Sequence, residues 1–173
     1  MQLMLADLEL ERLYDHHAQA LFAFLLNFTR DEDDTRDLLQ EVFVKIARQP
    51  AALSAALDER SFLLRLAHNA AIDLMRRRGA RNKYHEQFAV EQLSQFVASA
   101  DPDEAAFRAE LSAALGKLPP EQRVVVHLKL WEGLTFEQVA ATLDIPANTA
   151  ASRFRYALDK LRHLLRPLYQ EIK

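Results

Sequence analysis

Apolar residues recur at helical spacing through the first half of the chain. Between residues 10 and 28 their intervals of three, four or seven place them along one stripe of a helix. This stripe consists of Leu10, Leu13, Tyr14, Leu21, Leu25 and Phe28. Two similar stripes predict a helix that stops near Pro50 and a helix that runs into the arginines before Gly79. Their apolar positions are Leu38, Leu39, Val42, Phe43 and Ile46, then Phe62, Leu63, Leu66, Ala70 and Leu74. We therefore predict a three-helix domain over residues 1–81.

The pattern changes after this domain. Residues 82–105 are polar, with scattered apolar positions and a Ser-Ala-Asp-Pro break, so we interpret them as a linker. Helical spacing returns in 106–173, where Pro119 and Pro120 predict a helix start, because the first turn does not need the amide hydrogen that proline lacks. The fold class predicted is all-α, with two helical domains joined by a linker and four helices in the second.

The segment from Leu134 to Arg162 predicts a helix-turn-helix. Thr135 and Gln138 have the spacing of a capping box, in which each side chain binds the backbone amide of the other residue. The turn is expected from Asp144 to Pro146, since proline is favoured in the first turn of a helix. Apolar side chains should hold the two helices together. They are Val139, Ala140 and Leu143 on the first helix, and Ala150, Phe154, Ala157, Leu158 and Leu161 on the second.

The outward side of the second helix carries candidate DNA-binding residues. Polar side chains near a helix N-terminus can contact base edges in the major groove, arginine can fork onto guanine, and further basic residues can neutralise phosphates. The outward residues are Asn148, Ser152, Arg153, Arg155, Tyr156 and Lys160. An ordinary helical hairpin with a solvated face is the alternative. The agreement of capping box, turn and basic outer face favours DNA binding.

Composition and charge narrow the function classes. The chain has no cysteine, which excludes disulfides and thiolate zinc sites. Its histidines and glycines form no recognisable metal or phosphate site, so we expect no metal, no cofactor and no enzymatic activity. The net charge of −3 conceals acidic residues gathered in 30–41 and basic residues in 74–83 and 153–166. These clusters either are solvated helix faces or serve two partners of different charge. No secretory signal or membrane insertion is expected, which fits the cytoplasm.

Several segments are similar to a known family. The segment LPPEQRVVVHLKLWEGLTFEQVAATLDIPANTAASRFRYALDKLR resembles region 4 of bacterial extracytoplasmic-function (ECF) sigma factors, which reads the minus-35 promoter element. DLLQEVFVKIAR resembles region 2.2, and SFLLRLAHNAAIDLMRRRGAR resembles regions 2.3 and 2.4. Both modules stand in the family's order. The resemblance implies a sigma factor that binds core RNA polymerase and directs promoter-specific initiation, with region 2 melting and reading the minus-10 element.

The resemblance also implies roles for single residues. Asp37, Gln40 and Glu41, with Phe43 nearby, would dock onto the beta-prime clamp helices of the polymerase. The minus-10 strand would meet Arg65, Asn69, Asp73, Arg76 and Arg77. The loop of residues 51–61 would help enclose an extruded base, and Arg78 and Arg81 would extend the basic groove. The minus-35 duplex would meet Asn148, Thr149, Ser152, Arg153, Arg155, Tyr156 and Lys160.

The resemblance further implies contact with the beta flap of the polymerase and regulation by an anti-sigma factor. The chain departs from the commonest family pattern at Ala151, where many relatives carry lysine, so Arg155 or Tyr156 would contribute more to base recognition. Two other functions stay open at this point. One is a helix-turn-helix regulator with a helical sensor domain, and the other is an all-helical enzyme such as a metal-dependent phosphohydrolase. Trp131 ends an apolar-rich helix, and we expect it to pack behind the helix-turn-helix.

Overall fold

The computed structural model describes the backbone of residues 2–78 and 102–171, with side chains for 8–78 and 102–167. Within these ranges the chain forms helices and turns and no strand. It divides into two compact units, Met1–Asn82 and Lys83–Lys173. The predicted all-α class is confirmed.

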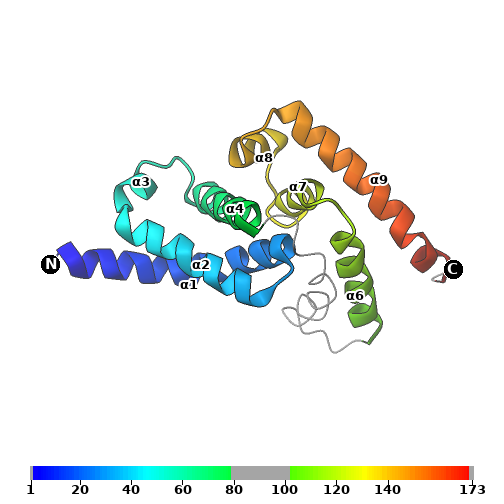
Figure 1. Ribbon diagram of the computed structural model, residues 1–173, viewed down its shortest axis with the longest axis horizontal. Helices are drawn as coiled ribbons and strands as arrows, with labels where there is room; N and C mark the ends of the chain where they lie inside the picture. The colour runs from blue at the N-terminus through cyan, green and yellow to red at the C-terminus, as the bar shows by residue number, and fades with distance from the viewer. Residues whose placement is uncertain (1, 79–101, 172–173) are drawn as a thin grey trace. The chain divides into compact units, whose positions relative to one another are not determined.

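The first unit is built on a long helix. Its helices are α1 (Gln2–Thr29), α2 (Glu32–Arg48), α3 (Pro50–Ser54) and α4 (Glu59–Arg78). Figure 1 shows α1 running beneath α2, and α1 packs against both α2 and α4, which also pack against each other. Their apolar stripes form one core, because burying such stripes is the main stabilising term in a small domain. The largest fully buried side chains of this unit are Phe24, Leu13, Leu25, Leu26, Leu63, Leu64 and Val42.

Two expectations about this unit were wrong. The connection after Pro50 contains a short helix, because Pro50 both stops α2 and occupies the first turn of α3, where a missing amide hydrogen is harmless. Tyr14 does not lie in the core: it is half exposed, although its ring packs on Phe43 with centroids 5.0 Å apart. The predicted end of the second helix near Pro50 is confirmed, since α2 ends at Arg48.

The corner between α1 and α2 is closed by polar contacts. Arg30 adopts a left-handed backbone with φ 59°. The Asp31 side chain accepts a hydrogen bond from the Asp34 amide at 2.9 Å and so caps α2. The Thr35 hydroxyl donates to the Asp31 carbonyl oxygen at 2.6 Å. Acidic residues in the first turn of α2 also suit the positive end of the helix dipole.

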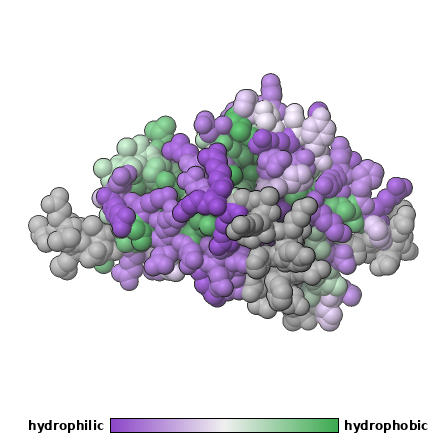
Figure 2. All heavy atoms as spheres, viewed as in Figure 1, coloured by the Kyte–Doolittle hydropathy of each residue, from purple (hydrophilic) through white to green (hydrophobic). Residues whose placement is uncertain are grey.

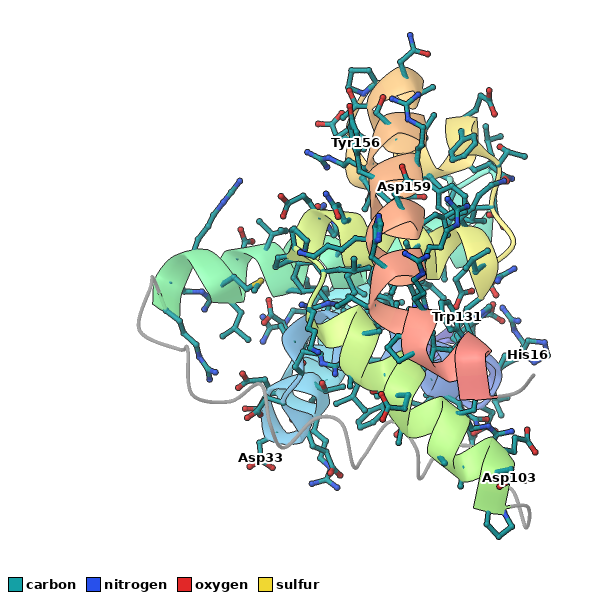
Figure 3. All side chains as sticks on the ribbon, turned by 90° about the vertical axis from the view of Figure 1, so that its right-hand side faces the viewer. His16, Asp33, Asp103, Trp131, Tyr156 and Asp159 are labelled. Carbon is teal, nitrogen blue, oxygen red and sulfur yellow. The ribbon has the colours of Figure 1, made fainter. Side chains whose placement is uncertain are left out.

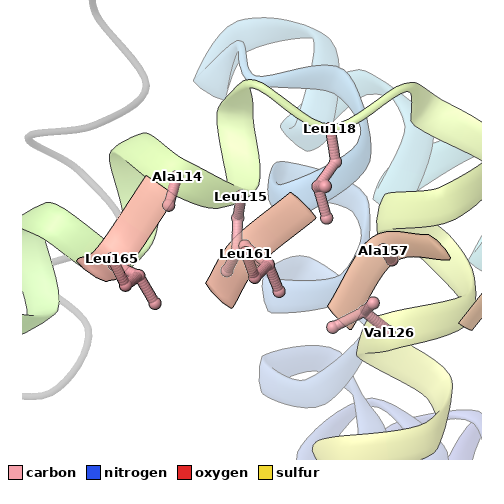
Figure 4. Close-up of a cluster of buried hydrophobic side chains, with 7 residues drawn as sticks. All are labelled: Ala114, Leu115, Leu118, Val126, Ala157, Leu161 and Leu165. Carbon is pink, nitrogen blue, oxygen red and sulfur yellow. The ribbon is translucent and has the colours of Figure 1, made fainter. Parts of the chain in front are cut away.

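The second unit contains α6 (Pro102–Gly116), α7 (Pro120–Leu130), α8 (Phe136–Leu143) and α9 (Ala147–Glu171). Figure 4 shows apolar side chains from α6, α7 and α9 meeting in one cluster. The cluster consists of Ala114, Leu115, Leu118, Val126, Ala157, Leu161 and Leu165. The α6–α7 turn is held by Arg123, which is 4% exposed and donates to the carbonyl oxygens of Leu115 at 3.0 Å and Leu118 at 2.9 Å.

The predicted linker overlaps the second unit. Residues 102–105 belong to the first turns of α6 and not to a linker, because Pro102 opens that helix. The rest of the predicted linker, residues 82–101, lies outside the described residues.

Candidate functional site

The helix-turn-helix is fixed by a complete capping box. The Gln138 amide donates to the Thr135 hydroxyl oxygen at 3.2 Å, and the Thr135 amide donates to the Gln138 side-chain oxygen at 2.8 Å. Asp144 ends α8 in a left-handed conformation with φ 54°, which aspartate tolerates better than most residues. The Ile145 amide then donates to the Ala140 carbonyl oxygen at 3.0 Å. The predicted capping box and turn are thereby confirmed.

Small and aromatic side chains set the crossing of α8 and α9. Ala150 is completely buried and Ala140 nearly so, which lets the two backbones approach closely. Phe136 and Phe154 make an edge-to-face contact with centroids 5.6 Å apart. The Lys129 ammonium ties α7 to this pair, because it donates to the Leu134 carbonyl oxygen at 3.0 Å and lies 4.7 Å from the centre of the Phe136 ring.

The outward side of α9 gathers the predicted minus-35 residues. Asn148, Arg155, Tyr156 and Lys160 are exposed, whereas Thr149, Ser152 and Arg153 are partly buried. Helical spacing arranges them in two neighbouring rows. The rows are Asn148, Ser152, Arg155 and Asp159, then Thr149, Arg153, Tyr156 and Lys160. Figure 3 labels Tyr156 and Asp159, both exposed on α9.

Two contacts shape this outward surface. The Arg155 guanidinium lies 5.2 Å from the centre of the Tyr156 ring. Asp159, which the sequence analysis missed, pairs with Arg162 at 3.1 Å. An acidic side chain in a row otherwise suited to DNA is counterbalanced by that arginine. Its position, seven residues after Ser152, is the signal that could have revealed it.

The exposed row of α4 contains all the predicted minus-10 residues. Arg65, Asn69, Asp73 and Arg76 are spaced by four, four and three residues, so they share one side of the helix, and Arg77 adjoins them. All five are exposed. Asp73 lies among cations, because Arg76 pairs with its carboxylate at 3.8 Å and the Arg77 side chain donates to its carbonyl oxygen at 3.2 Å.

The basic cluster at the end of α4 is smaller than the sequence predicts. Arg78 forms an ion pair with Asp34, so it links α4 to the start of α2 and does not extend the exposed groove. Arg81 lies outside the described residues. At the other end of the row, the Arg65 guanidinium lies 5.7 Å from the centre of the Phe62 ring. The exposed row therefore runs from Arg65, beside the partly buried Phe62, to the pair Arg76 and Arg77.

The loop between α3 and α4 presents an exposed apolar side chain shortly before α4 begins. Leu57 is completely exposed. In Figure 2 pale green, apolar surface covers α3 and the loop after it, among mostly hydrophilic neighbours. The Asp58 carboxylate accepts from the Ser61 amide at 3.1 Å and caps α4; hydrogen bonding from Ser61 lowers the pKa of Asp58, against the opposing effect of burial.

The outward side of α2 bears the residues predicted to bind polymerase, with one correction. Asp37 and Gln40 are exposed, and Glu41 pairs with Lys45 at 2.8 Å. Phe43 is only 7% exposed and its ring packs against Tyr14 of α1, so most of its side chain is buried beside the outward face.

An apolar groove of about 570 Å³ adjoins this face. Its lining, from α1 and α2, comprises Leu10, Tyr14, Phe22, Arg36, Leu39, Gln40, Phe43, Val44 and Ala47. The sequence analysis missed this groove. The sequence signal for this groove was the adjacent apolar pair Leu13 and Tyr14. Together they make the apolar stripe of α1 wider than the surface that the neighbouring helices cover.

The described histidine and tryptophan side chains make stacking, edge-to-face and ion-pair contacts. Trp131 is half exposed and stacks on the His127 ring with centroids 5.5 Å apart, so the expectation that it packs behind the helix-turn-helix was wrong. His17 pairs with Glu59, and His68 contacts Phe28 edge-to-face. Among the side chains that the structure describes, we find no cluster of three or more histidine or acidic residues suited to a metal ion. No helix in the described ranges is long and apolar enough to cross a membrane.

Comparison with family models matches both units. The model described as Sigma-70 region 2 matches residues 13–81, and the model described as Sigma-70, region 4 matches residues 114–163. The chain belongs to the ECF sigma factors of the sigma-70 family. It is 31% identical over 160 residues to the ECF RNA polymerase sigma factor SigL of Mycobacterium tuberculosis, covering 90% of this chain and 88% of SigL.

Other relatives agree with this membership. RNA polymerase sigma factor CarQ of Myxococcus xanthus is 30% identical over 94% of this chain and 92% of its own length. SigE of Mycolicibacterium smegmatis is 30% identical over 90% of this chain, which spans 61% of the length of SigE. Sigma factor RpoE of Bartonella quintana, solved with the anti-sigma factor NepR, has the same fold, with a TM-score of 0.71 and 22% identity over 91% of this chain and 97% of that one.

Membership settles the class of function. An ECF sigma factor directs promoter-specific initiation of transcription with core RNA polymerase. The alternative of a regulator with a sensor domain is not favoured, because the region 2 model matches the segment that would have to be the sensor. The predicted family and function are confirmed.

Proposed function

We propose that this ECF sigma factor divides promoter binding between α4 and α9 and docks onto polymerase through α2. Region 2, proposed over residues 1–81, would bind the opened minus-10 strand, and region 4, proposed over residues 106–173, would read the minus-35 duplex. The observation that supports this division best is the exposed row of α4, which places an Asn and Asp pair between arginines on one helix, after a loop with an exposed leucine.

The α4 row has the chemistry that single-stranded DNA requires. Extruding a base costs a few kcal/mol of lost stacking, which contacts to the extruded base and a basic track must offset. Leu57 offers an apolar contact, and the Asn69 and Asp73 side chains can bind base edges, since a carboxylate accepts from the amino group of cytosine. Arg65, with Arg76 and Arg77, can neutralise the backbone.

Replacing Asn69 and Asp73 together by Ala tests this role. Both side chains are exposed, so the fold and the affinity for core polymerase should change little. Open-complex formation, followed by permanganate reactivity of promoter thymines, should fall at least tenfold. Asp15→Ala, which removes an exposed acid of α1, is the matched control. Equal loss of polymerase binding and of opening would contradict the proposed role.

The α9 rows suit duplex DNA in the major groove. Asn148 and Ser152 lie near the N-terminus of α9, where a recognition helix contacts base edges. Arg155 is held beside Tyr156, so it reaches the groove with fewer conformations to lose. Because Ala151 offers no charge, Arg155 and Tyr156 would make the base contacts that many relatives obtain from lysine. Lys160 would contact phosphate.

The outward face of α2 would bind the beta-prime clamp helices of core polymerase. Asp37, Gln40 and Glu41 suit a basic or polar helix, and the neighbouring groove can accept an apolar side chain from the same partner. Region 4 would bind the beta flap. Since RpoE is bound by an anti-sigma factor, an anti-sigma factor that covers these surfaces is also proposed here. Because core polymerase and promoter DNA lie in the bacterial cytoplasm, this is the proposed location.

A further inference from the structure

Three side chains from two helices meet at the first residue of α4. The Arg12 guanidinium donates to Oε2 of Glu59 at 2.8 Å, and Nε2 of His17 lies 2.7 Å from Oε1 of the same carboxylate. Arg12 and His17 belong to α1, so one carboxylate joins helices that are more than forty residues apart in the sequence.

This cluster differs from the usual pair on a helix surface. Pairs such as Arg36 with Glu32 join residues on one helix and stabilise little beyond that helix. Here the His17 side chain is only 15% exposed and Glu59 is 34% exposed, so solvent screens the contact less. The hydrogen bond from Arg12 lowers the pKa of Glu59, His17 adds to that effect, and burial opposes it. The carboxylate is therefore charged throughout the physiological pH range.

The position of Glu59 decides what the cluster holds in place. The loop 55–58 separates α3 from α4, and it ends at Asp58, whose side chain caps the helix. Glu59 comes next and lies one turn before the buried Leu63, on the side of α4 that packs against α1. The cap fixes the loop end to α4, and the Glu59 cluster fixes that end to α1. Leu57 stands directly before these two anchors.

We propose that Arg12, His17 and Glu59 are positioning residues that hold the loop 55–58, and with it Leu57, in the geometry that selects one base of the opened minus-10 strand. This inference rests on the proposed role of the α4 row in binding that strand. The cluster contacts no DNA itself. Its effect is on base preference, because a loop held before binding loses less freedom on binding and admits fewer alternative base positions.

The test uses the holoenzyme formed from core polymerase and the full chain. Its affinity is measured by fluorescence anisotropy for single-stranded oligonucleotides that carry the minus-10 element of a promoter transcribed by the wild type, with each base changed in turn. Glu59→Ala should reduce discrimination at one position at least fivefold and leave the other positions within twofold. Leu57→Ala should affect that same position, and the double variant should resemble Leu57→Ala alone.

Glu9→Ala is the matched control. It removes the other carboxylate that pairs with Arg12, at 2.7 Å, but that pair lies within α1 and does not join α1 to α4. It should leave base preference unchanged. Exchanging the charges, with Arg12→Glu and Glu59→Arg together, should recover part of the discrimination that either change alone removes. If Glu59→Ala does not unfold cooperatively in circular dichroism, Arg12→Met replaces it with the same expectation.

The outcomes separate this inference from the function it rests on. Uniform weakening at every position, or intact discrimination in Glu59→Ala while Leu57→Ala loses it, would overturn the positioning role alone. If neither Leu57→Ala nor the combined Asn69 and Asp73 change alters strand binding, the proposed function of the α4 row is wrong as well.

Discussion

Arg123→Met should destabilise the second unit far more than a surface arginine change does. The Arg123 guanidinium is buried and donates to the carbonyl oxygens of Leu115 at 3.0 Å, Gly116 at 3.2 Å and Leu118 at 2.9 Å. The Leu115 and Gly116 carbonyls lie at the C-terminal end of α6, where a helix runs out of its own amide donors, and Leu118 follows in the turn. The Leu115 oxygen also accepts from the Leu118 amide at 3.1 Å, so Arg123 ties the whole turn together. Methionine fills a similar volume but donates no hydrogen bond.

The magnitude follows from these contacts. Each hydrogen bond from a charged donor contributes about 1.5–3 kcal/mol, and burying the guanidinium takes back part of that sum. We therefore expect a loss of about 2–4 kcal/mol in the free energy of unfolding. With a urea dependence of about 1–2 kcal/mol per molar, the midpoint should fall by about 1–4 M.

The chain supplies its own reporter for this experiment. Trp131 is the single tryptophan. It lies at the end of α7 against His127, so urea titration followed by tryptophan fluorescence reports the second unit. Arg162→Met is the matched control, because the Arg162 side chain is 75% exposed and pairs only across one turn. A change of less than about 1 kcal/mol in Arg123→Met would refute the reasoning from buried carbonyl contacts.

Two further predictions concern the first unit. The pKa values of Asp58 and Glu59 are lowered in the folded chain, so their charged forms stabilise the fold. This stabilisation is fully present at a pH above their ordinary pKa values of about 3.9 and 4.3, and it is lost as the pH falls through the lowered pKa values. The unfolding temperature, measured by circular dichroism between pH 6 and pH 3, should therefore fall more steeply in the wild type than in Glu59→Gln. Parallel curves of unfolding temperature against pH would contradict this. Phe43→Ala should cost about 3 kcal/mol through a core cavity, whereas Gln40→Ala should weaken polymerase binding with an unchanged unfolding temperature. If Phe43→Ala weakened polymerase binding without loss of stability, Phe43 would instead belong to the docking face.

Local sequence signals predicted the helix-turn-helix well. The Thr135 and Gln138 pair acts within three residues, so its capping box could be read without the tertiary structure. The row from Arg65 to Arg76 was equally accessible, because helical spacing alone decides which side chains share a side. Pro50 misled for a local reason, since proline that ends one helix can also open the next.

The remaining features depend on contacts between distant segments. Arg78 was predicted with its basic neighbours, but its pairing with Asp34 requires the packing of α4 against α2. The contact between Phe43 and the half-exposed Tyr14 of α1 joins two helices, and periodicity within either helix does not show it. The Glu59 cluster likewise joins α1 to α4, and the periodicity of neither helix predicts it.

Transcription with purified components tests the central claim most directly. Core RNA polymerase, this chain and promoter fragments from the genome that encodes it are mixed without any other sigma factor, and transcript starts are mapped. We predict transcripts that start at fixed positions downstream of shared minus-35 and minus-10 elements, and that are lost when either element is changed. Transcripts that appear only after another sigma factor is added would contradict the account.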